Sequence, residues 1–259
     1  MIRQVRDEDK EVLIRLLEKK NPFAALISTL YNAFYKIGLC EIFLCRDRYG
    51  RYCVAAKYFG ELTIYAERFT SVHELAEFID MSPDITMVFC ENKVAKKLIS
   101  YIKSDMAVSS SYIVRCRKMS EDFKVPDRAK DLKEVFSLLK AEFESYKGTV
   151  YEEFYCDVFH RQKIGADGFF IKIKDSELLS CASVLSKNGC VSVISNVATK
   201  KQHRNQGHAR TLISGICNDI VKSGAMPYLF CATKGVYPFY KKLGFRRSGK
   251  FARLTKIST

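Results

Sequence analysis

A short segment in the C-terminal part of the chain limits what it can fold into more than any other feature. Residues 190–198 alternate apolar and polar side chains as a half-buried strand does, and a loop containing Gly207 follows. After the loop, apolar residues recur at helical spacing, at Ala209, Leu212, Ile213, Ile216 and Ile220. The first N–H groups of such a helix lack partners and carry partial positive charge. The segment therefore predicts a strand, a turn that binds phosphate through backbone amides, and a helix.

A second motif follows the first along the chain. About thirty residues beyond Gly207 comes the segment 235–245, which reads Gly-Val-Tyr-Pro-Phe-Tyr-Lys-Lys-Leu-Gly-Phe. Its apolar residues are spaced for a short helix that packs inward. A pattern as loose as Arg-x-x-Gly-x-Ala is weak evidence alone, because it often occurs by chance. Both motifs at this separation occur by chance far less often.

An internal repeat organises the rest of the chain. Residues 36–47 and 53–56 are echoed by residues 163–174 and 181–184, at an offset of about 127 residues. Each half therefore predicts helices first, then a meander of two or three strands, and then helix, strand and helix. Because the order of these elements matches, we favour a duplication over a chance likeness of composition.

Together the two C-terminal motifs resemble the signatures of the GNAT superfamily of N-acetyltransferases. The first signature falls on Val197, Arg204, Gly207 and Ala209, and the second on Phe239, Tyr240, Gly244 and Phe245. Thr233 stands where GNAT proteins usually carry Asn, and Val236 where they usually carry Ala. These departures concern the pantetheine side of the site and leave the pyrophosphate loop intact. The resemblance covers roughly the last 140 residues.

The resemblance implies a fold class and a cofactor. The fold class is α/β (α+β), with two GNAT-like mixed central sheets flanked by helices. The cofactor is acetyl-CoA, whose pyrophosphate lies on the loop amides at the start of the helix. The residues expected to bind it are Val197, Ala198, Thr199, Arg204, Asn205, Gln206, Gly207, His208, Ala209 and Arg210.

Acetyl transfer requires that a neutral amine attack the thioester, that an oxyanion form and that a thiolate leave. GNAT proteins splay their sheet at the strand end and leave an amide unpaired, which implies Val197 or Ala198 as the oxyanion donor. Tyr240 is the expected acid for the thiolate, because a phenol is protonated at neutral pH and can donate to the developing charge. The alternative is that Tyr240 is a core aromatic whose hydroxyl merely finds a partner.

The base that accepts the amine proton is not evident, because residues 190–198 contain no carboxylate. Candidate bases lie on the predicted helices before the sheet, at Glu142, Glu144, Glu152, Glu153, Asp157 and His160. Each of them fits a solvated helix surface better than a catalytic role, and a water chain to solvent would also serve. A covalent route through Cys231 is the least favoured, because no His or acid adjoins it in sequence to activate the thiol.

The first half lacks an equivalent phosphate-binding loop. Residues 64–74 stand at the matching place, and no glycine occurs between Glu61 and Asp80. Side chains would crowd a pyrophosphate there, and the acids Glu67 and Glu74 would repel it. We therefore expect that the first half is a degenerate copy that shapes the acceptor site or supports the second half.

The expected domains are a degenerate GNAT-like domain at residues 1–120 and an acetyl-CoA-binding GNAT domain at residues 121–259. The junction is bracketed by the serines at 109–111 and by the polar segment 120–127.

Composition limits the setting of the protein. No apolar run reaches eighteen residues and the N-terminal segment is charged from Arg3, so we expect neither a membrane span nor a signal peptide, and a cytoplasmic location. The ten cysteines include no Cys-x-x-Cys pair, and the histidines lack zinc spacing, so no metal is expected. Most of the cysteines are expected to be small buried hydrophobes.

Basic charge is concentrated around the predicted loop. Thirteen Lys and Arg follow Asn196 against a single acid, Asp219, and they supply most of the net charge of +14. A basic mouth would attract the phosphates of coenzyme A. RNA binding is an alternative, with stacking by Tyr237, Phe239 and Tyr240, but these aromatics lie in the segment that predicts a helix packed inward.

The favoured function is acetyl-CoA-dependent N-acetyl transfer to a primary amine, by direct attack in a ternary complex. The acceptor is a small-molecule amine or a protein amine, and neither a membrane nor a nucleic acid is the expected partner. A CoA-responsive regulator without catalytic activity is the other alternative, alongside RNA binding.

Overall fold

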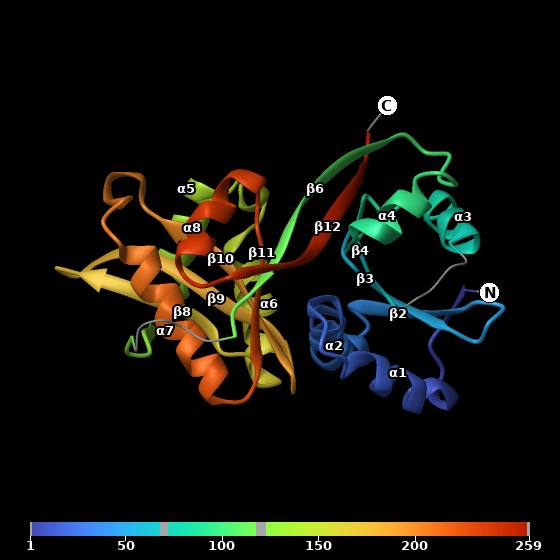
Figure 1. The fold of residues 1–259 in the computed structure, drawn as a ribbon, viewed down its shortest axis with the longest axis horizontal. Helices are drawn as coiled ribbons and strands as arrows, with labels where there is room; N and C mark the ends of the chain where they lie inside the picture. Colours follow the sequence, from blue (N-terminus) through green and yellow to red (C-terminus); the bar gives the residue numbers. More distant parts are fainter. Residues whose placement is uncertain (1, 68–71, 118–122, 258–259) are drawn as a thin grey trace. The chain divides into compact units, whose positions relative to one another are not determined.

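The computed structural model describes residues 2–67, 72–117 and 123–257, and the chain folds as two compact α/β units (Figure 1). The first unit comprises Met1–Ile113, Phe230–Tyr237 and Arg247–Thr259, and the second comprises Val114–Leu229 and Pro238–Arg246. Each unit is therefore discontinuous in sequence, because it is built from two or three separate segments of the chain. The junction expected near residue 120 lies outside the described residues.

The first unit is a mixed sheet in the order β1-β2-β3-β4-β5-β12-β6. Strands β4 and β5 are parallel, whereas the pairs β1/β2, β2/β3, β3/β4 and β5/β12 are antiparallel. The strands are β1 (Ile2–Gln4), β2 (Cys40–Arg46), β3 (Tyr52–Tyr58), β4 (Glu61–Ala66), β5 (Met87–Glu91), β6 (Met106–Arg115) and β12 (Arg246–Lys256). The helices are α1 (Lys10–Leu17), α2 (Pro22–Phe34), α3 (His73–Met81) and α4 (Asn92–Leu98).

Helix α2 shows how local sequence sets an element of the first unit. Asn21 is its N-cap, and the Asn21 side chain accepts a hydrogen bond from the Phe23 amide at 2.8 Å. Pro22 stands at the first helical position, where its missing N–H costs nothing. The helix is apolar around most of its circumference and its residues Phe23 to Ile27 include four that are fully buried, so it packs on the sheet as a core element.

The core of the first unit contains a cluster of four phenylalanines. Phe89 of β5 lies 5.0 Å from Phe23, 5.0 Å from Phe230 and 5.4 Å from Phe251 between ring centroids. All of these pairs are tilted or edge-to-face, the arrangement that aromatic quadrupoles favour. Two of the four rings come from the C-terminal segments, so the first unit is not complete without them.

The second unit is a mixed sheet in the order β11-β10-β9-β8-β7, in which only β10 and β11 are parallel. The strands are β7 (Asp127–Arg128), β8 (Gly168–Lys174), β9 (Glu177–Asn188), β10 (Val191–Thr199) and β11 (Met226–Phe230). The α-helices are α5 (Leu132–Glu142), α6 (Tyr151–Lys163), α7 (His208–Lys222) and α8 (Tyr237–Lys242). Short 3₁₀ turns occur at η3 (Glu144–Tyr146), η4 (Lys201–His203) and η5 (Lys234–Val236).

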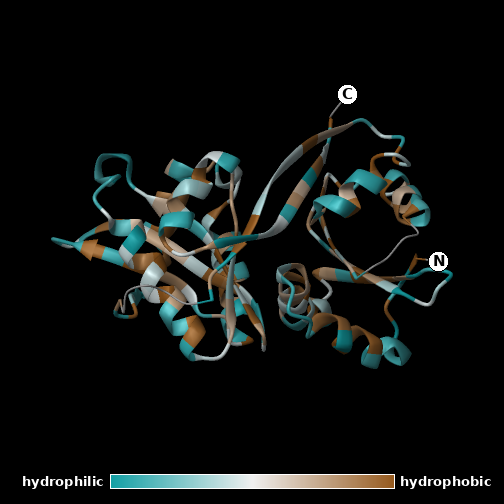
Figure 2. Ribbon diagram, viewed as in Figure 1, coloured by the Kyte–Doolittle hydropathy of each residue, from teal (hydrophilic) through white to brown (hydrophobic). Residues whose placement is uncertain are grey.

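Helices cover both faces of this second sheet. Helices α5 and α6 pack on β8, β9 and β10 through one apolar cluster, and α7 packs on the same three strands from the opposite side (Figure 1). The residues Leu212, Ile213, Ile216 and Ile220 of α7 are buried, as their spacing predicted, whereas Ala209 of the same predicted face is half-buried. In Figure 2 the strands and the helix sides turned toward them are largely apolar, whereas polar residues occupy the outer sides.

The expected fold class is confirmed, with a mixed sheet and flanking helices in each unit. The order of helices and strands after the first strand is the same in residues 10–115 as in residues 132–256. The short strands β1 and β7 and the closing strands β6 and β12 were not predicted. The serines at 109–111, expected beside the junction, lie within strand β6. Among the described residues, no helix has the length and apolar character that a bilayer crossing needs.

We expect Phe89→Ala to lower the free energy of unfolding by about 3–5 kcal/mol, because Phe89 is 5% exposed and contacts three other rings. Chemical denaturation measures the change. Phe59→Ala removes the same atoms from a side chain that is 69% exposed, and we expect a change of about 0.5 kcal/mol or less. Equal effects of the two substitutions would contradict the assignment of the core.

Candidate active site

Strand β10 extends beyond its parallel neighbour. Residues Val191 to Ile194 pair with Met226 to Leu229 of β11, and no described residue of β11 pairs with the rest of β10. Of the remaining residues, Ser195, Ala198 and Thr199 pair with β9 on the other edge. Backbone groups of β10 that point toward the β11 edge therefore have no sheet partner there.

An irregularity in the pairing with β9 occurs in this same part of β10. Ser195 pairs with Ser183 and Ala198 pairs with Cys181, so three steps along β10 match two along β9. The extra residue is a β-bulge, and Asn196 within it has a φ of +52°. This left-handed backbone conformation is uncommon for a residue other than glycine, although Asn adopts it more readily than most.

The bulge fixes which way the following amides point. The Lys200 N–H donates to the Leu179 carbonyl of β9 at 3.0 Å, and Ala198, two residues earlier, pairs with Cys181 of the same strand. Because successive N–H groups of a strand point to opposite edges, the amides of Val197 and Thr199 point to the edge that β11 has left. Burial raises the pKa of Cys181 to about 12, so its sulfur is a neutral thiol.

The turn after β10 has the predicted open form. Asn205 and Gly207 have φ values of +62° and +84°, and both are exposed. A Cβ built on Gly207 would meet no atom within 4 Å, so the space above its backbone is open. The first backbone bond of α7 runs from the Thr211 N–H to the Gly207 carbonyl at 3.0 Å, and the amides of His208 and Ala209 come before it. These amides suit a bound diphosphate.

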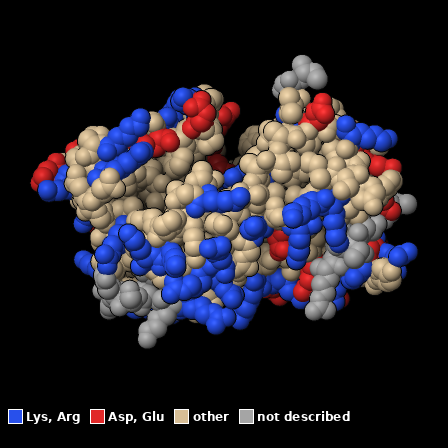
Figure 3. Space-filling view, turned by 45° about the horizontal axis from the view of Figure 1, so that its top comes forward, with Lys and Arg blue, Asp and Glu red and all other residues tan. Residues whose placement is uncertain are grey.

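Several charged side chains beside this turn are engaged in ion pairs. The Glu177 carboxylate lies 2.8 Å from Lys200 Nζ and 3.3 Å from His203 Nε2. The hydrogen bond from Lys200 holds the pKa of Glu177 below its ordinary value. The Arg204 guanidinium pairs with the Glu142 carboxylate, and its Nε donates to the Thr199 carbonyl at 3.2 Å. Figure 3 shows Lys and Arg side chains gathered over one face of the molecule.

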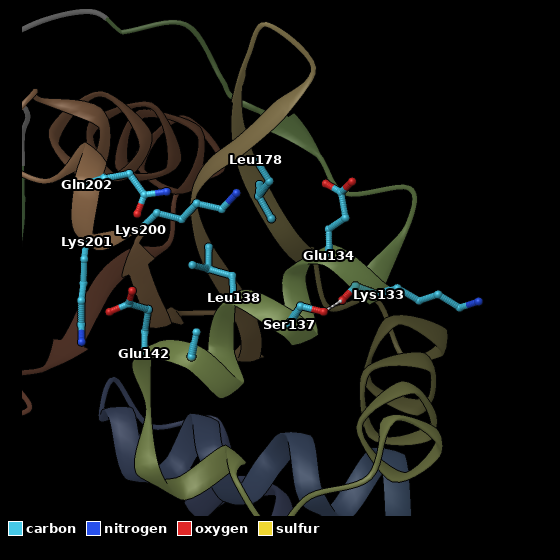
Figure 4. Close-up of a pocket in the computed structure, with 10 residues that line it drawn as sticks. Lys133, Glu134, Ser137, Leu138, Glu142, Leu178, Lys200, Lys201 and Gln202 are labelled. Carbon is cyan, nitrogen blue, oxygen red and sulfur yellow. Dashed lines mark hydrogen bonds between the residues drawn. The ribbon is translucent and has the colours of Figure 1, made fainter.

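A pocket of about 540 Å³ adjoins the turn within the second unit. In Figure 4, Leu138 and Leu178 point into it, Lys200 runs along its rim, and Lys133 points away. The carboxylate of Glu142 is part of its wall and also binds Arg204, so one residue joins the pocket to the turn. The remaining lining residues are Glu134, Ser137, Ala141, Lys201 and Gln202.

The second motif forms the short helix that was predicted. Tyr240 lies on α8 and is 8% exposed, with its ring 5.1 Å from Phe239 and 5.8 Å from Phe245. The Phe245 N–H donates to the Tyr240 carbonyl at 3.1 Å, and Gly244 supplies the positive φ that ends the helix. Tyr240 is buried and offers no face for base stacking, whereas Phe239 is 38% exposed, so the inward packing expected of these aromatics holds for Tyr240 and not for Phe239.

The candidate bases occupy different surroundings. Glu142 is paired with Arg204, and Asp157 accepts bidentate hydrogen bonds from Arg161 at 2.8 and 3.1 Å. Glu144 pairs with Lys147 on the surface. Glu152 and Glu153 are exposed in the first turn of α6, and His160 is half-buried in its last turn.

The cysteines are free thiols, and eight of the ten are buried. Burial raises the pKa of Cys231 to about 11, so it is a poor candidate for a covalent nucleophile. Within the described ranges, no three residues among His, Cys, Asp and Glu are grouped so that they could hold a metal ion.

Sequence reasoning missed the side chains that meet at the bulge, which are Tyr146, Ser183 and Asn196. The Tyr146 hydroxyl donates to Asn196 Oδ1 at 3.0 Å, and Asn196 Nδ2 donates to Ser183 Oγ at 3.0 Å. An Asn inside a run of valines was the one signal that could have pointed to this position, because Asn is depleted in regular strands and tolerates a positive φ.

Comparison with known proteins agrees with this geometry. A profile described as GNAT acetyltransferase matches residues 55–254. No curated protein matches the chain. Among solved structures, a Drosophila protein is similar with a TM-score of 0.67 and 11% identity, covering 99% of this chain and 98% of that one.

Two further structures share the fold at comparably low identity. A tandem GNAT protein from the clavulanic acid biosynthesis pathway has a TM-score of 0.60 and 12% identity, covering 98% of this chain and 97% of that one. A GNAT-family acetyltransferase from Colwellia psychrerythraea has a TM-score of 0.59 and 11% identity, covering 99% and 100%. With the profile match over most of its length, this chain belongs to the GNAT acetyltransferase family.

Proposed function

We propose that the protein is an acetyl-CoA-dependent N-acetyltransferase that transfers the acetyl group directly to a primary amine in a ternary complex. The observation that carries the proposal is the continuous segment from the bulge of β10 to the start of α7. It places unpaired strand amides and an open helix N-terminus within fifteen residues of one another. Family membership supports the same reaction.

The residues of the turn fit the diphosphate of acetyl-CoA. Gly207 leaves open space where any other residue would place a Cβ, and the amides of His208 and Ala209 precede the first helical hydrogen bond. The amides from Arg204 to Arg210 would hold the diphosphate, and Val197, Ala198 and Thr199 would line the thioester arm. When bound, acetyl-CoA supplies an activated acetyl group.

The oxyanion donor proposed here is the Val197 amide. Of the two amides expected from sequence, that of Ala198 is turned toward β9, where Ala198 pairs with Cys181, whereas alternation along the strand turns the Val197 amide toward the open edge. A fixed N–H that points to the reacting carbonyl stabilises the charge that develops on its oxygen.

Tyr240 remains the proposed acid for the departing thiolate. Its helix is held by the packing of Tyr240, Leu243 and Phe245, all of which are buried. A phenol fixed by packing can donate to sulfur without reorganising during the reaction. The amine proton would leave through a water chain, because the two most buried acids among the candidate bases, Glu142 and Asp157, are engaged with Arg204 and Arg161.

We propose that the first unit is a duplicated and degenerate GNAT copy. The two halves share one order of helices and strands, which supports a duplication. Residues 68–71, part of the segment that would correspond to the phosphate-binding turn, lie outside the described residues. The companion unit would then not bind acetyl-CoA itself.

Release of free thiol from acetyl-CoA across a panel of small primary amines and lysine-bearing peptides tests the proposed function. We expect amine-dependent release and an acetylated product by mass spectrometry. Tight binding of acetyl-CoA by calorimetry, without turnover on any amine, would instead favour a CoA-responsive regulator. The absence of acetyl-CoA binding would overturn both readings.

We expect Gly207→Ala to weaken acetyl-CoA binding by about tenfold or more, or about 1.4 kcal/mol, because the new methyl group enters the diphosphate site. Calorimetry measures the affinity. Gly224→Ala is the matched control, since Gly224 follows the other end of α7 with a φ of +83° and has equally open space. Both variants carry the same backbone strain, so an equal loss of affinity would place the diphosphate elsewhere.

We expect Tyr240→Phe to lower kcat by about a hundredfold, because the thiolate loses its proton donor while the buried ring stays in place. The KM for acetyl-CoA is expected to stay within about twofold of the wild-type value. Steady-state kinetics provides both constants. Tyr228→Phe removes a hydroxyl from another buried ring of the second unit, and we expect it to retain the wild-type kcat. A Tyr240→Phe enzyme with the wild-type kcat would remove the acid assignment.

A further inference from the structure

The bulge of β10 is the one place in that strand where the backbone is in an unfavourable conformation. Asn196 has a φ of +52°, and a non-glycine residue held there typically costs about 1–2 kcal/mol unless its surroundings favour it. Such a conformation persists only when several contacts determine it together.

Contacts from two directions converge on this residue. On one side, the Tyr146 hydroxyl donates to the Asn196 carboxamide oxygen at 3.0 Å. On the other, the carboxamide nitrogen donates to Ser183 Oγ at 3.0 Å, and Cys181 Sγ donates to the Asn196 backbone carbonyl at 3.7 Å. Both ends of the side chain and the main chain itself are thus held.

Ser183 of β9 connects the same network to Ser195 of β10. Its hydroxyl donates to the Ser195 carbonyl at 3.2 Å and lies 3.0 Å from the Ser195 hydroxyl. Asn196 is therefore fixed to the residue before it through the neighbouring strand β9. A regular strand would not place these three polar side chains together, because successive residues alternate between faces.

Tyr146 is itself held firmly. It lies on η3 between α5 and α6, and its ring packs 6.1 Å from Phe154 and 6.3 Å from Phe143 between centroids. Burial raises the pKa of Tyr146 above its ordinary value, so its hydroxyl keeps its proton throughout the physiological range. It can therefore donate to Asn196 at any pH at which the protein works.

We propose that Asn196 and Tyr146 are positioning residues that hold the bulge of β10, and that they thereby keep the Val197 amide aimed at the edge where the thioester lies. The expected effect on the reaction rate rests on the proposed acetyl transfer, whereas the role of the two residues in holding the backbone rests on the geometry of the bulge alone. Neither residue touches the reacting atoms, since each acts through the backbone of β10.

The clamp also links the segment between α5 and α6 to the strand. Tyr146 and Asn196 are fifty residues apart in sequence, so a displacement of η3 would change the direction of the Val197 amide. A molecule that binds against η3 would therefore change the reaction rate without changing the affinity for the diphosphate.

The test uses four single variants of the full-length protein and one double variant, Tyr146→Phe with Asn196→Gly. Asn196→Ala removes the carboxamide and disfavours a positive φ, whereas Asn196→Gly removes the carboxamide but allows that backbone conformation. Tyr146→Phe removes only the hydroxyl. Asn188→Ala is the matched control, because its side chain accepts hydrogen bonds from two amides at the opposite end of β10, at 3.0 and 2.9 Å.

We expect Asn196→Ala to lower kcat by at least about tenfold with little change in the KM for acetyl-CoA, and Asn196→Gly to recover most of that loss. Tyr146→Phe is expected to lower kcat in the wild-type background and to have no further effect in the Asn196→Gly background. The control is expected to keep the wild-type kcat. A wild-type kcat for Asn196→Ala, or no difference between Ala and Gly, would overturn the proposal.

Amide hydrogen exchange of the unliganded protein gives a second readout that does not depend on turnover. We expect fast exchange at Val197 and slow exchange at Ala198 in the wild type, and at least about tenfold faster exchange at Ala198 in Asn196→Ala. Unchanged exchange at Ala198 would overturn the clamp. A wild-type protein that shows this exchange pattern but acetylates no amine would instead refute the proposed function.

Discussion

Strand β10 has to stop pairing with β11 before it ends, and the chemistry proposed for this protein depends on that. In a fully paired sheet every N–H is already donated to a neighbour, so none is left for a ligand. Pairing with β11 ends at Ile194, and the bulge at Asn196 follows within two residues. The cost of the left-handed backbone is offset by Tyr146, Ser183 and Cys181, which contact a single residue from two sides.

Backbone amides, more than side-chain charge, make the turn after β10 suitable for an anion. Lys200 and His203 share Glu177, and Arg204 is held by Glu142, so the nearest cations are partly neutralised by local acids. The large basic surplus of the C-terminal region would then act at longer range, where it would attract the proposed phosphorylated cofactor and raise its rate of encounter. In this proposal, backbone amides bind the diphosphate, and the Lys and Arg side chains attract it from a distance.

The sequence predicted what is local and missed what is distant. The strand before Gly207, the helix after it and the short helix with Tyr240 are confirmed, because each depends on spacing within about fifteen residues. The Tyr146 contact joins residues fifty positions apart and follows no periodicity. Phe230 and Phe251 complete the core of the first unit although they lie far along the sequence from most of it. No local pattern could therefore indicate that they pack there. The choice between Val197 and Ala198 needed the bulge register, which composition does not encode.

The interleaving of the two units has a consequence for how the protein is made. Strand β12 and the ring of Phe251 belong to the first unit, although they follow the whole of the second unit along the chain. A ribosome therefore finishes the second unit's residues while the first still lacks a strand and part of its aromatic core. Until Phe251 emerges, the open edge of β5 and the phenylalanines beside it are exposed to other nascent chains. Synthesis of β12 therefore ends this exposure of the first unit.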